Sequence, residues 1–187
     1  MKILPFRSFN ETDIVNQYSL TTTGEMGTFV SISAANMDNQ HNWSTATPGA
    51  SYDHIHSYRY ETKATVRPCA SGDNKFNVLG YTLFNVLEED ENGELYKFYK
   101  QKAVENSVVL SGEAVPVVTD GVVTLKSDAY VGTPTINAAV LPADDGKVRF
   151  ASSSFATSTG ANGSDAAFAK VIGTGSKQGG YAMIKFV

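Results

Sequence analysis

The fold class of this 187-residue chain is decided by the stretch Ser111-Gly-Glu-Ala-Val-Pro-Val-Val-Thr-Asp-Gly-Val-Val-Thr-Leu125. Two runs rich in β-branched residues flank Asp120-Gly121, the dipeptide that a two-residue hairpin prefers because both positions must tolerate a positive φ. Pro116 has no amide donor, so we expect the first run to be an edge strand at that point or to carry a bulge. The stretch therefore predicts two strands joined by a turn.

Segments of strand length continue on both sides of this stretch. Thr28 to Ser33 alternates apolar and polar residues, as a half-buried strand does, and 75–87 is apolar on both faces, as a central strand is. Gly or Asp-Gly separates most of the later candidates, which are 107–110, 135–140, 147–151, 167–172 and 181–187. This spacing predicts an all-β fold, a compact sandwich or barrel of short and mainly antiparallel strands.

The segment after the apolar run at 75–87 allows two predictions. Residues 88–94 form a polar tip that contains Asn92-Gly93, a favoured hairpin turn, and 95–100 would then be the return strand. The alternative is a helix over 94–105, one face of which would hold Leu95, Phe98, Tyr99 and Lys102. The hairpin is the preferred interpretation, and the choice between strand and helix stays open.

The length of the chain fits one domain. We expect this β-rich domain to span residues 21–187 and to follow an extended N-terminal arm, residues 1–20, in which neither strand nor helical periodicity is sustained and Pro5 restricts the backbone early. Two long loops are expected, one over the polar segment 34–57 and one over the Ser/Thr/Gly/Ala-rich segment 151–165.

Charge and cysteine content exclude several classes of partner. The net charge is −4 and no basic stripe is present, so nucleic acid is not an expected partner. No apolar stretch approaches the roughly 20 residues of a membrane span, so no membrane is expected either. The N-terminus lacks the apolar region of a signal peptide, and the single cysteine cannot form an internal disulfide, which together favour folding in a reducing cytoplasm. We expect Cys69 to be a small buried hydrophobe.

The candidates for catalysis and cofactor binding are weak, and we expect a protein without enzyme activity, cofactor or metal. The Gly-rich segment 171–180 runs into a strand pattern rather than a helix, which predicts a turn and not a phosphate loop. His54 and His56 would share one strand face and are the best metal candidates, but Asp53 would point the opposite way, so a surface loop is preferred. The four carboxylates at 88–91 are expected to be a solvated tip, because a general acid needs burial to raise its pKa.

Four stretches carry a resemblance to a known family: Val108-Val-Leu-Ser-Gly-Glu-Ala-Val-Pro-Val117, Asp120-Gly-Val-Val-Thr-Leu125, Ile172-Gly173 and Gly179-Gly-Tyr-Ala-Met-Ile184. From about Asn77 onward, the chain resembles the β-rich decoration (cement) proteins of tailed-bacteriophage capsids. The resemblance rests on the rhythm of strands and glycines. It implies a non-enzymatic virion protein that binds the outside of an expanded shell of major capsid protein, often as a trimer, after assembly in the cytoplasm of the bacterial host.

The expected contacts with the major capsid protein are Phe6, Arg7 and Phe9 in the arm and Trp43 in the long loop. Aromatic residues and arginine are enriched at interface hot spots. The resemblance implies that extended termini reach neighbouring subunits, and an arm that orders on binding would clamp them at an entropic cost. Deleting residues 1–20 is then expected to leave a folded β domain that no longer holds the capsid.

Two other functions stay open. One is a tail, neck or head-fibre component, which would also be a structural protein of the virion but present in few copies. The other is a carbohydrate-binding β module with weak glycan affinity. It would use aromatic residues within 41–60, namely Trp43, Tyr52, Tyr58 and Tyr60, although the tyrosines also suit an ordinary strand face.

Overall fold

The computed structural model describes residues 2–20, 22–34, 65–154 and 167–187. The strands in these segments are β1 (Ile3–Ser8), β2 (Ile14–Leu20), β3 (Phe29–Ala34), β4 (Thr65–Pro68), β5 (Val78–Thr82), β6 (Asn85–Val86), β7 (Val108–Val109), β8 (Ala114–Val118), β9 (Val122–Lys126), β10 (Tyr130–Val131), β11 (Ala138–Ala143), β12 (Lys147–Ser154), β13 (Ala169–Gly175) and β14 (Tyr181–Phe186). The helical elements are η1 (Glu11–Asp13), η3 (Tyr96–Phe98), α3 (Lys100–Glu105), η4 (Ser127–Ala129), η5 (Asp144–Gly146) and η6 (Lys177–Gly179). The all-β prediction is confirmed.

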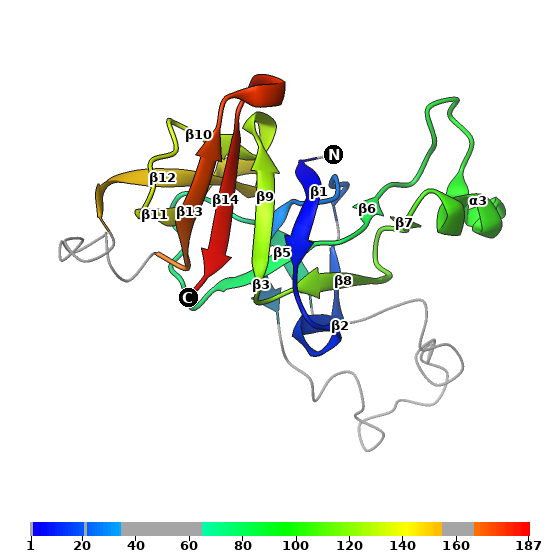
Figure 1. Cartoon of the computed structure of the whole chain (residues 1–187). Coiled ribbons are helices and arrows are strands. Elements are labelled where there is room, and N and C mark those ends of the chain that lie inside the picture. Colours follow the sequence, from blue (N-terminus) through cyan, green and yellow to red (C-terminus); the bar gives the residue numbers. More distant parts are fainter. Residues whose placement is uncertain (1, 21, 35–64, 155–166) are drawn as a thin grey trace, which may run out of the picture.

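The strands form two main bodies (Figure 1). One is a seven-stranded sheet in the order β1-β9-β14-β13-β11-β12-β10, and the other is a closed barrel in the order β2-β4-β3-β5-β8. Most pairs in both bodies are antiparallel. The strands β6 and β7 form a separate two-stranded parallel sheet outside both bodies.

The barrel and the sheet share one hydrophobic core. Phe29 and Tyr81 come from the barrel and Phe186 from the sheet, and the ring centroid of Phe29 lies 5.9 Å from that of Tyr81 and 5.6 Å from that of Phe168. Neighbouring residues on a strand point to opposite faces, so Val118 packs in this shared core while Val117 fills the barrel interior. This double burial explains why β8 is apolar along almost its whole length.

In place of the extended arm expected over residues 1–20, the structure has two strands. β1 pairs with β9 at the edge of the seven-stranded sheet, and β2 closes the barrel between β4 and β8. Ile3 and Leu20 are fully buried. Pro5 is compatible with β1 because the strand is at an edge and its register with β9 shifts between Ile3 and Arg7. The periodicity is hard to see in the sequence because η1 divides two short strands that belong to different sheets.

The predicted hairpin at Asp120-Gly121 is wrong, although both of its strands exist. β8 pairs with β2 and β5 in the barrel, whereas β9 pairs with β1 and β14 in the sheet. Asp120-Gly121 is therefore a corner between the two bodies, and η1 makes the matching corner between β1 and β2. Gly121 has a φ of 110°, and a Cβ there would lie 2.4 Å from the backbone oxygen of Ser8. The two chain segments cross the junction side by side.

Other local predictions have mixed outcomes. The register between β2 and β8 shifts opposite Pro116, between Val15 and Tyr18, so the expected irregularity is present, but the extra residue lies in β2 and not in the strand of Pro116. In the Gly-rich segment 171–180, residues 176–180 form the predicted turn between the paired strands β13 and β14, whereas 171–175 belong to β13 itself. The predicted strand at 75–87 is divided into two shorter strands, β5 over Val78–Thr82 and β6 over Asn85–Val86. Residues 151–154 lie in β12 and not in the expected loop, whereas 155–165 and 35–57 lie outside the described residues.

Candidate interaction surface

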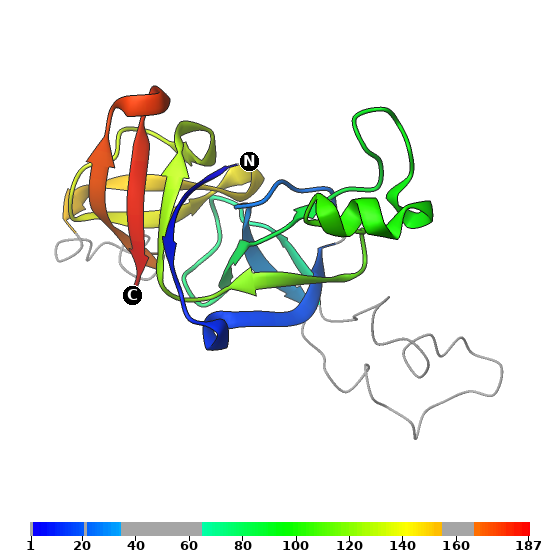
Figure 2. The same ribbon diagram turned by 45° about the vertical axis from the view of Figure 1, so that its right-hand side comes forward.

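Residues 87–113, hereafter the projection, extend from the barrel on the side away from the seven-stranded sheet (Figures 1 and 2). They include η3, α3 and β7. The predicted return strand at 95–100 is therefore wrong, and the helical alternative over 94–105 is confirmed in its main part.

Side chains of the acidic tip hold the helix in place. The Asp90 carboxylate accepts hydrogen bonds from the backbone amides of Asn92 and Glu94, each at 2.8 Å, which forms a tight turn. The Lys102 ammonium in α3 pairs with Asp90 and, at 2.8 Å, with Glu94. The hydrogen bond from Lys102 lowers the pKa of Asp90 to about 2. Asp90 is thus ionised at neutral pH. The prediction of a solvated tip holds for Glu88, Glu89 and Glu91, which are exposed, but not for Asp90, whose side chain is buried against Lys102.

The projection has a small hydrophobic core of its own. Tyr96 of η3, Ala103 of α3 and Val108 of β7 are buried together, and Leu87 and Leu110 pack against them. Tyr96 and Ala103 can both turn inward because they lie on one side of the helical segment, an arrangement that a strand would not allow. This burial is what favours the helix over the hairpin.

The outer side of the projection carries three exposed apolar side chains. Phe98 is 71% exposed, Tyr99 is 51% exposed and Val104 is 78% exposed. The Lys97 ammonium lies 4.9 Å from the centroid of the Phe98 ring, a distance suited to a cation–π contact. A groove of about 220 Å³ lies beside Val104 and is lined by Tyr96, Lys100, Ala103, Val104, Val108, Leu110 and Glu113.

The projection also carries the charge imbalance of the chain. It contains seven of the 19 Asp and Glu residues but only three of the 15 Lys and Arg residues. Its net charge therefore equals the −4 of the whole chain, and the remaining residues are balanced. An exposed apolar surface beside excess carboxylates is an arrangement that can bind another macromolecule.

The contact residues predicted from sequence lie elsewhere or outside the described residues. Phe6 and Arg7 belong to β1, on the sheet, and Arg7 is exposed. Phe9 is half-buried against the shared core, with its ring centroid 6.0 Å from the Arg7 guanidinium carbon. The structure thus brings Arg7 and Phe9 together, but not with Phe98 of the projection. Trp43 lies outside the described residues, as do His54 and His56.

Phe98, Tyr99 and Val104 are not among the contacts predicted from the sequence. The sequence pattern that could have indicated Phe98 and Tyr99 is the alternative helix over 94–105, which places both residues on one face. That pattern indicates an amphipathic helix but does not say which face is covered, because coverage depends on residues distant in the sequence.

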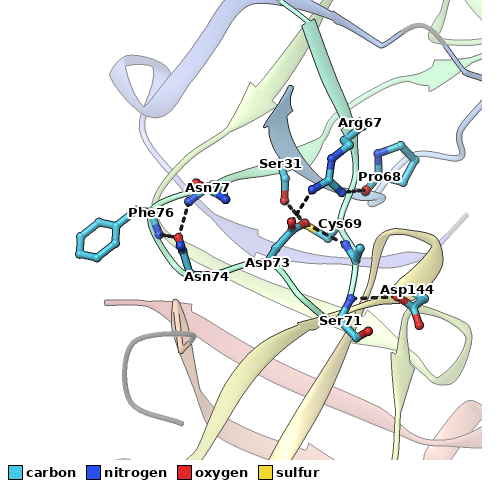
Figure 3. Close-up of polar contacts among 11 residues, drawn as sticks. Ser31, Arg67, Pro68, Cys69, Ser71, Asp73, Asn74, Phe76, Asn77 and Asp144 are labelled. Atoms are coloured by element: carbon cyan, nitrogen blue, oxygen red, sulfur yellow. Dashed lines mark hydrogen bonds and ion pairs between the residues drawn. The ribbon is translucent and has the colours of Figure 1, made fainter. Parts of the chain in front are cut away.

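A dense polar cluster joins β3, β4 and the loop that follows them (Figure 3). The Ser31 hydroxyl donates a 2.6 Å hydrogen bond to the Asp73 carboxylate, so the Cys69 thiol, 3.1 Å from the Ser31 oxygen, is the donor in that contact. Asp73 also accepts from the Ala70 amide at 2.9 Å and pairs with the Arg67 guanidinium. Cys69 is buried, as predicted, and this burial raises its pKa to about 12. The thiol therefore stays protonated at neutral pH, and the cluster pins the loop to the barrel.

Replacing Asp73 by Asn is expected to lower the free energy of unfolding by about 2 kcal/mol at pH 7, because Ser31, Ala70 and Arg67 lose a charged acceptor. Burial alone would raise the pKa of Asp73, but these hydrogen bonds and the Arg67 charge outweigh it and lower the pKa below the usual 3.8. The stabilisation is therefore fully present well above the ordinary pKa of 3.8 and is lost as the pH falls through the lowered pKa. Urea denaturation at pH 7 and pH 2.5 checks this.

The matched control for this variant is Asp144→Asn, whose exposed carboxylate accepts a hydrogen bond from the Ser71 amide at 2.9 Å. It is expected to change stability by less than about 0.5 kcal/mol. An Asp73→Asn protein as stable as the control at pH 7 would show that the cluster does not hold the loop.

A second groove, of about 330 Å³, lies where the barrel meets the sheet. Lys75 and Val78 line it from the barrel side, and Phe168, Lys185 and Phe186 line it from the sheet side. Its volume is at the lower limit for small-molecule sites. Within the described ranges, no group of three or more His, Cys, Asp or Glu residues is arranged to hold a metal ion.

Comparison with known proteins adds no relative. No protein-family model matches this chain, and no curated protein sequence matches it. None of the helices in the described segments is long and apolar enough to span a membrane.

Proposed function

We propose that this protein is a non-enzymatic structural protein of a virion that binds the outer surface of an expanded capsid shell and stabilises it. The observation that carries the proposal is the exposed apolar surface of the projection. Phe98, Tyr99 and Val104 are all more than half exposed within seven residues, and Val104 also lines a groove. Scattered exposed apolar residues are ordinary, but a group of them on a protruding element is typical of an interaction site.

The resemblance to capsid decoration proteins supports the choice of partner. The resembling stretches 108–117 and 120–125 correspond to β7, β8 and β9, and 172–184 corresponds to β13 and β14. In this proposal the partner is the major capsid protein, and the protein is a trimer on the exterior of the virion. A protein that binds only the assembled shell stabilises it by mass action, because each bound copy favours the assembled state.

The position of residues 1–20 changes the proposed mode of attachment. An arm that orders on binding would lose conformational entropy. A projection with its own core and its own ion pairs presents its contact residues already ordered, so less entropy is lost on binding. We therefore assign the main contact to the projection, and no longer to Phe6, Arg7 and Phe9.

Quantitative mass spectrometry on gradient-purified particles from the source tests the proposal. A fixed ratio to the major shell protein, of the size that a lattice requires, is the expected result. A few copies per particle would favour the alternative of a tail, neck or head-fibre component. Absence from the particles would overturn the virion proposal and leave the carbohydrate-binding module, for which Trp43→Ala should abolish glycan binding.

A further inference from the structure

We propose that the projection docks on a protein surface that is apolar at its centre and basic at its rim. The identity of that partner, the capsid shell, rests on the proposed function, whereas its chemistry is inferred from the projection itself. The contact elements are the exposed side of η3 and α3, the groove beside Val104, and the carboxylates around them.

The centre of the interface is apolar because the exposed apolar side chains of the projection are removed from water most efficiently by an apolar surface on the partner. Phe98 and Tyr99 extend outward from a short, internally packed element, and aromatic side chains of this kind act as anchors in a partner's pocket. The groove between α3 and β7 is lined mainly by apolar atoms of Tyr96, Ala103 and Val108, so it can accept an apolar side chain in return. Side chains that interdigitate from both partners give an interface its packing density.

The rim of the partner is basic because the projection is acidic. Lys102 is already neutralised by Asp90 and Glu94, whereas Glu88, Glu91 and other carboxylates of the projection are exposed. A local excess of one charge steers association toward the opposite charge. It also disfavours three other occupants. Nucleic acid and anionic lipid would be repelled, and so would the projection of a second copy, because it carries the same charge.

The test uses shells purified from particles that were produced without this protein, to which the purified full-length protein is added. Binding is measured by co-sedimentation over a range of protein concentrations. The double variant Phe98→Ala/Val104→Ala is expected to bind at least about tenfold more weakly, as hot-spot truncations do. The matched control is Ile136→Ala/Val131→Ala, which removes side chains that are 64% and 54% exposed on the other body. It is expected to bind within about twofold of the wild type.

A second pair of variants tests the charge. Glu88→Gln/Glu91→Gln should weaken binding by about three- to tenfold at low ionic strength, and the difference should vanish near 0.5 M salt, where charges are screened. Glu11→Gln/Asp128→Asn changes the net charge equally but away from the projection, at exposed positions. This control is expected to bind like the wild type at every salt concentration.

The outcomes separate the two proposals. If the wild type does not bind the shells, the proposed function fails, and the assignment of the shell as partner fails with it. If the wild type binds but the projection variants bind equally well, only the docking inference is overturned. If the wild type sediments as an oligomer and Phe98→Ala/Val104→Ala sediments as a monomer, a second copy occupies the surface. That result also overturns the docking inference. Unchanged circular dichroism and melting temperature confirm that the variants are folded.

Discussion

A chain that lacks residues 1–20 is expected not to fold. The deletion removes β1 from the edge of the sheet and β2 from the barrel, which cannot close without it because β2 lies between β4 and β8. It also removes Ile3 from the shared core and Leu20 from the barrel interior. These losses together exceed the 5–15 kcal/mol by which folded domains are usually stable. The truncated protein should give no cooperative unfolding transition by circular dichroism or calorimetry.

Single substitutions on β1 separate the loss of the strand from the loss of its side chains. Ile3→Ala is expected to lower the free energy of unfolding by about 3 kcal/mol, as for other buried isoleucines. Arg7→Ala, which alters an exposed side chain on the same strand, should change it by less than about 0.5 kcal/mol. If the truncated chain melts like the full-length protein, residues 1–20 are an extended arm and not part of the folded domain. Phe6, Arg7 and Phe9 would then again be candidates for the residues that clamp the capsid.

Gly80→Ala is expected to destabilise the barrel by about 4 kcal/mol or more, which puts it among the most damaging single substitutions. A Cβ at position 80 would lie 1.8 Å from the carbonyl oxygen of Val118 and 2.7 Å from its carbonyl carbon. Both are backbone atoms of β8, so no side-chain rotation can relieve the overlap. β5 would have to move away from β8 and break the pairing of Tyr81 with Val118.

Gly72→Ala is the matched control, because a Cβ there would meet no atom within 4 Å. It is expected to change the free energy of unfolding, measured by urea denaturation, by less than about 0.5 kcal/mol. Both midpoints can be measured on the full-length protein by far-ultraviolet circular dichroism. If Gly80→Ala were within about 1 kcal/mol of Gly72→Ala, the close approach of β5 to β8 would be wrong.

Local sequence patterns predicted many individual strands correctly. Alternation at Thr28 to Ser33 identified β3, β-branched runs identified β8 and β9, and the strand pattern at 181–187 identified β14. Pro116 predicted an irregularity in strand pairing because a missing amide donor acts locally, although the extra residue lies in the neighbouring strand β2. The burial of Cys69 could also be predicted, since free cysteine is usually buried.

Patterns that were compatible with two structures could not be resolved from sequence. Residues 94–105 fit both a return strand and a helix, and the helix forms because Tyr96 and Ala103 are buried against Val108 of β7. The candidate interaction surface also results from this burial. Aromatic residues at 98 and 99 are visible in the sequence, but their exposure depends on which side of the projection its own core covers.

The sequence by itself determined the all-β class, the position of the turn at Asp120-Gly121 and the concentration of carboxylates in 87–113. These follow from backbone conformational preferences and from formal charge, which are properties of short segments. Only the tertiary structure decided that β8 and β9 do not pair with each other, that residues 3–8 and 14–20 are strands of two different bodies, and that Phe98 faces outward. The physical reason is that strand pairing and burial depend on hydrogen bonds and contacts with segments distant along the chain, and a turn residue such as Gly121 permits a change of direction without selecting the partner strand.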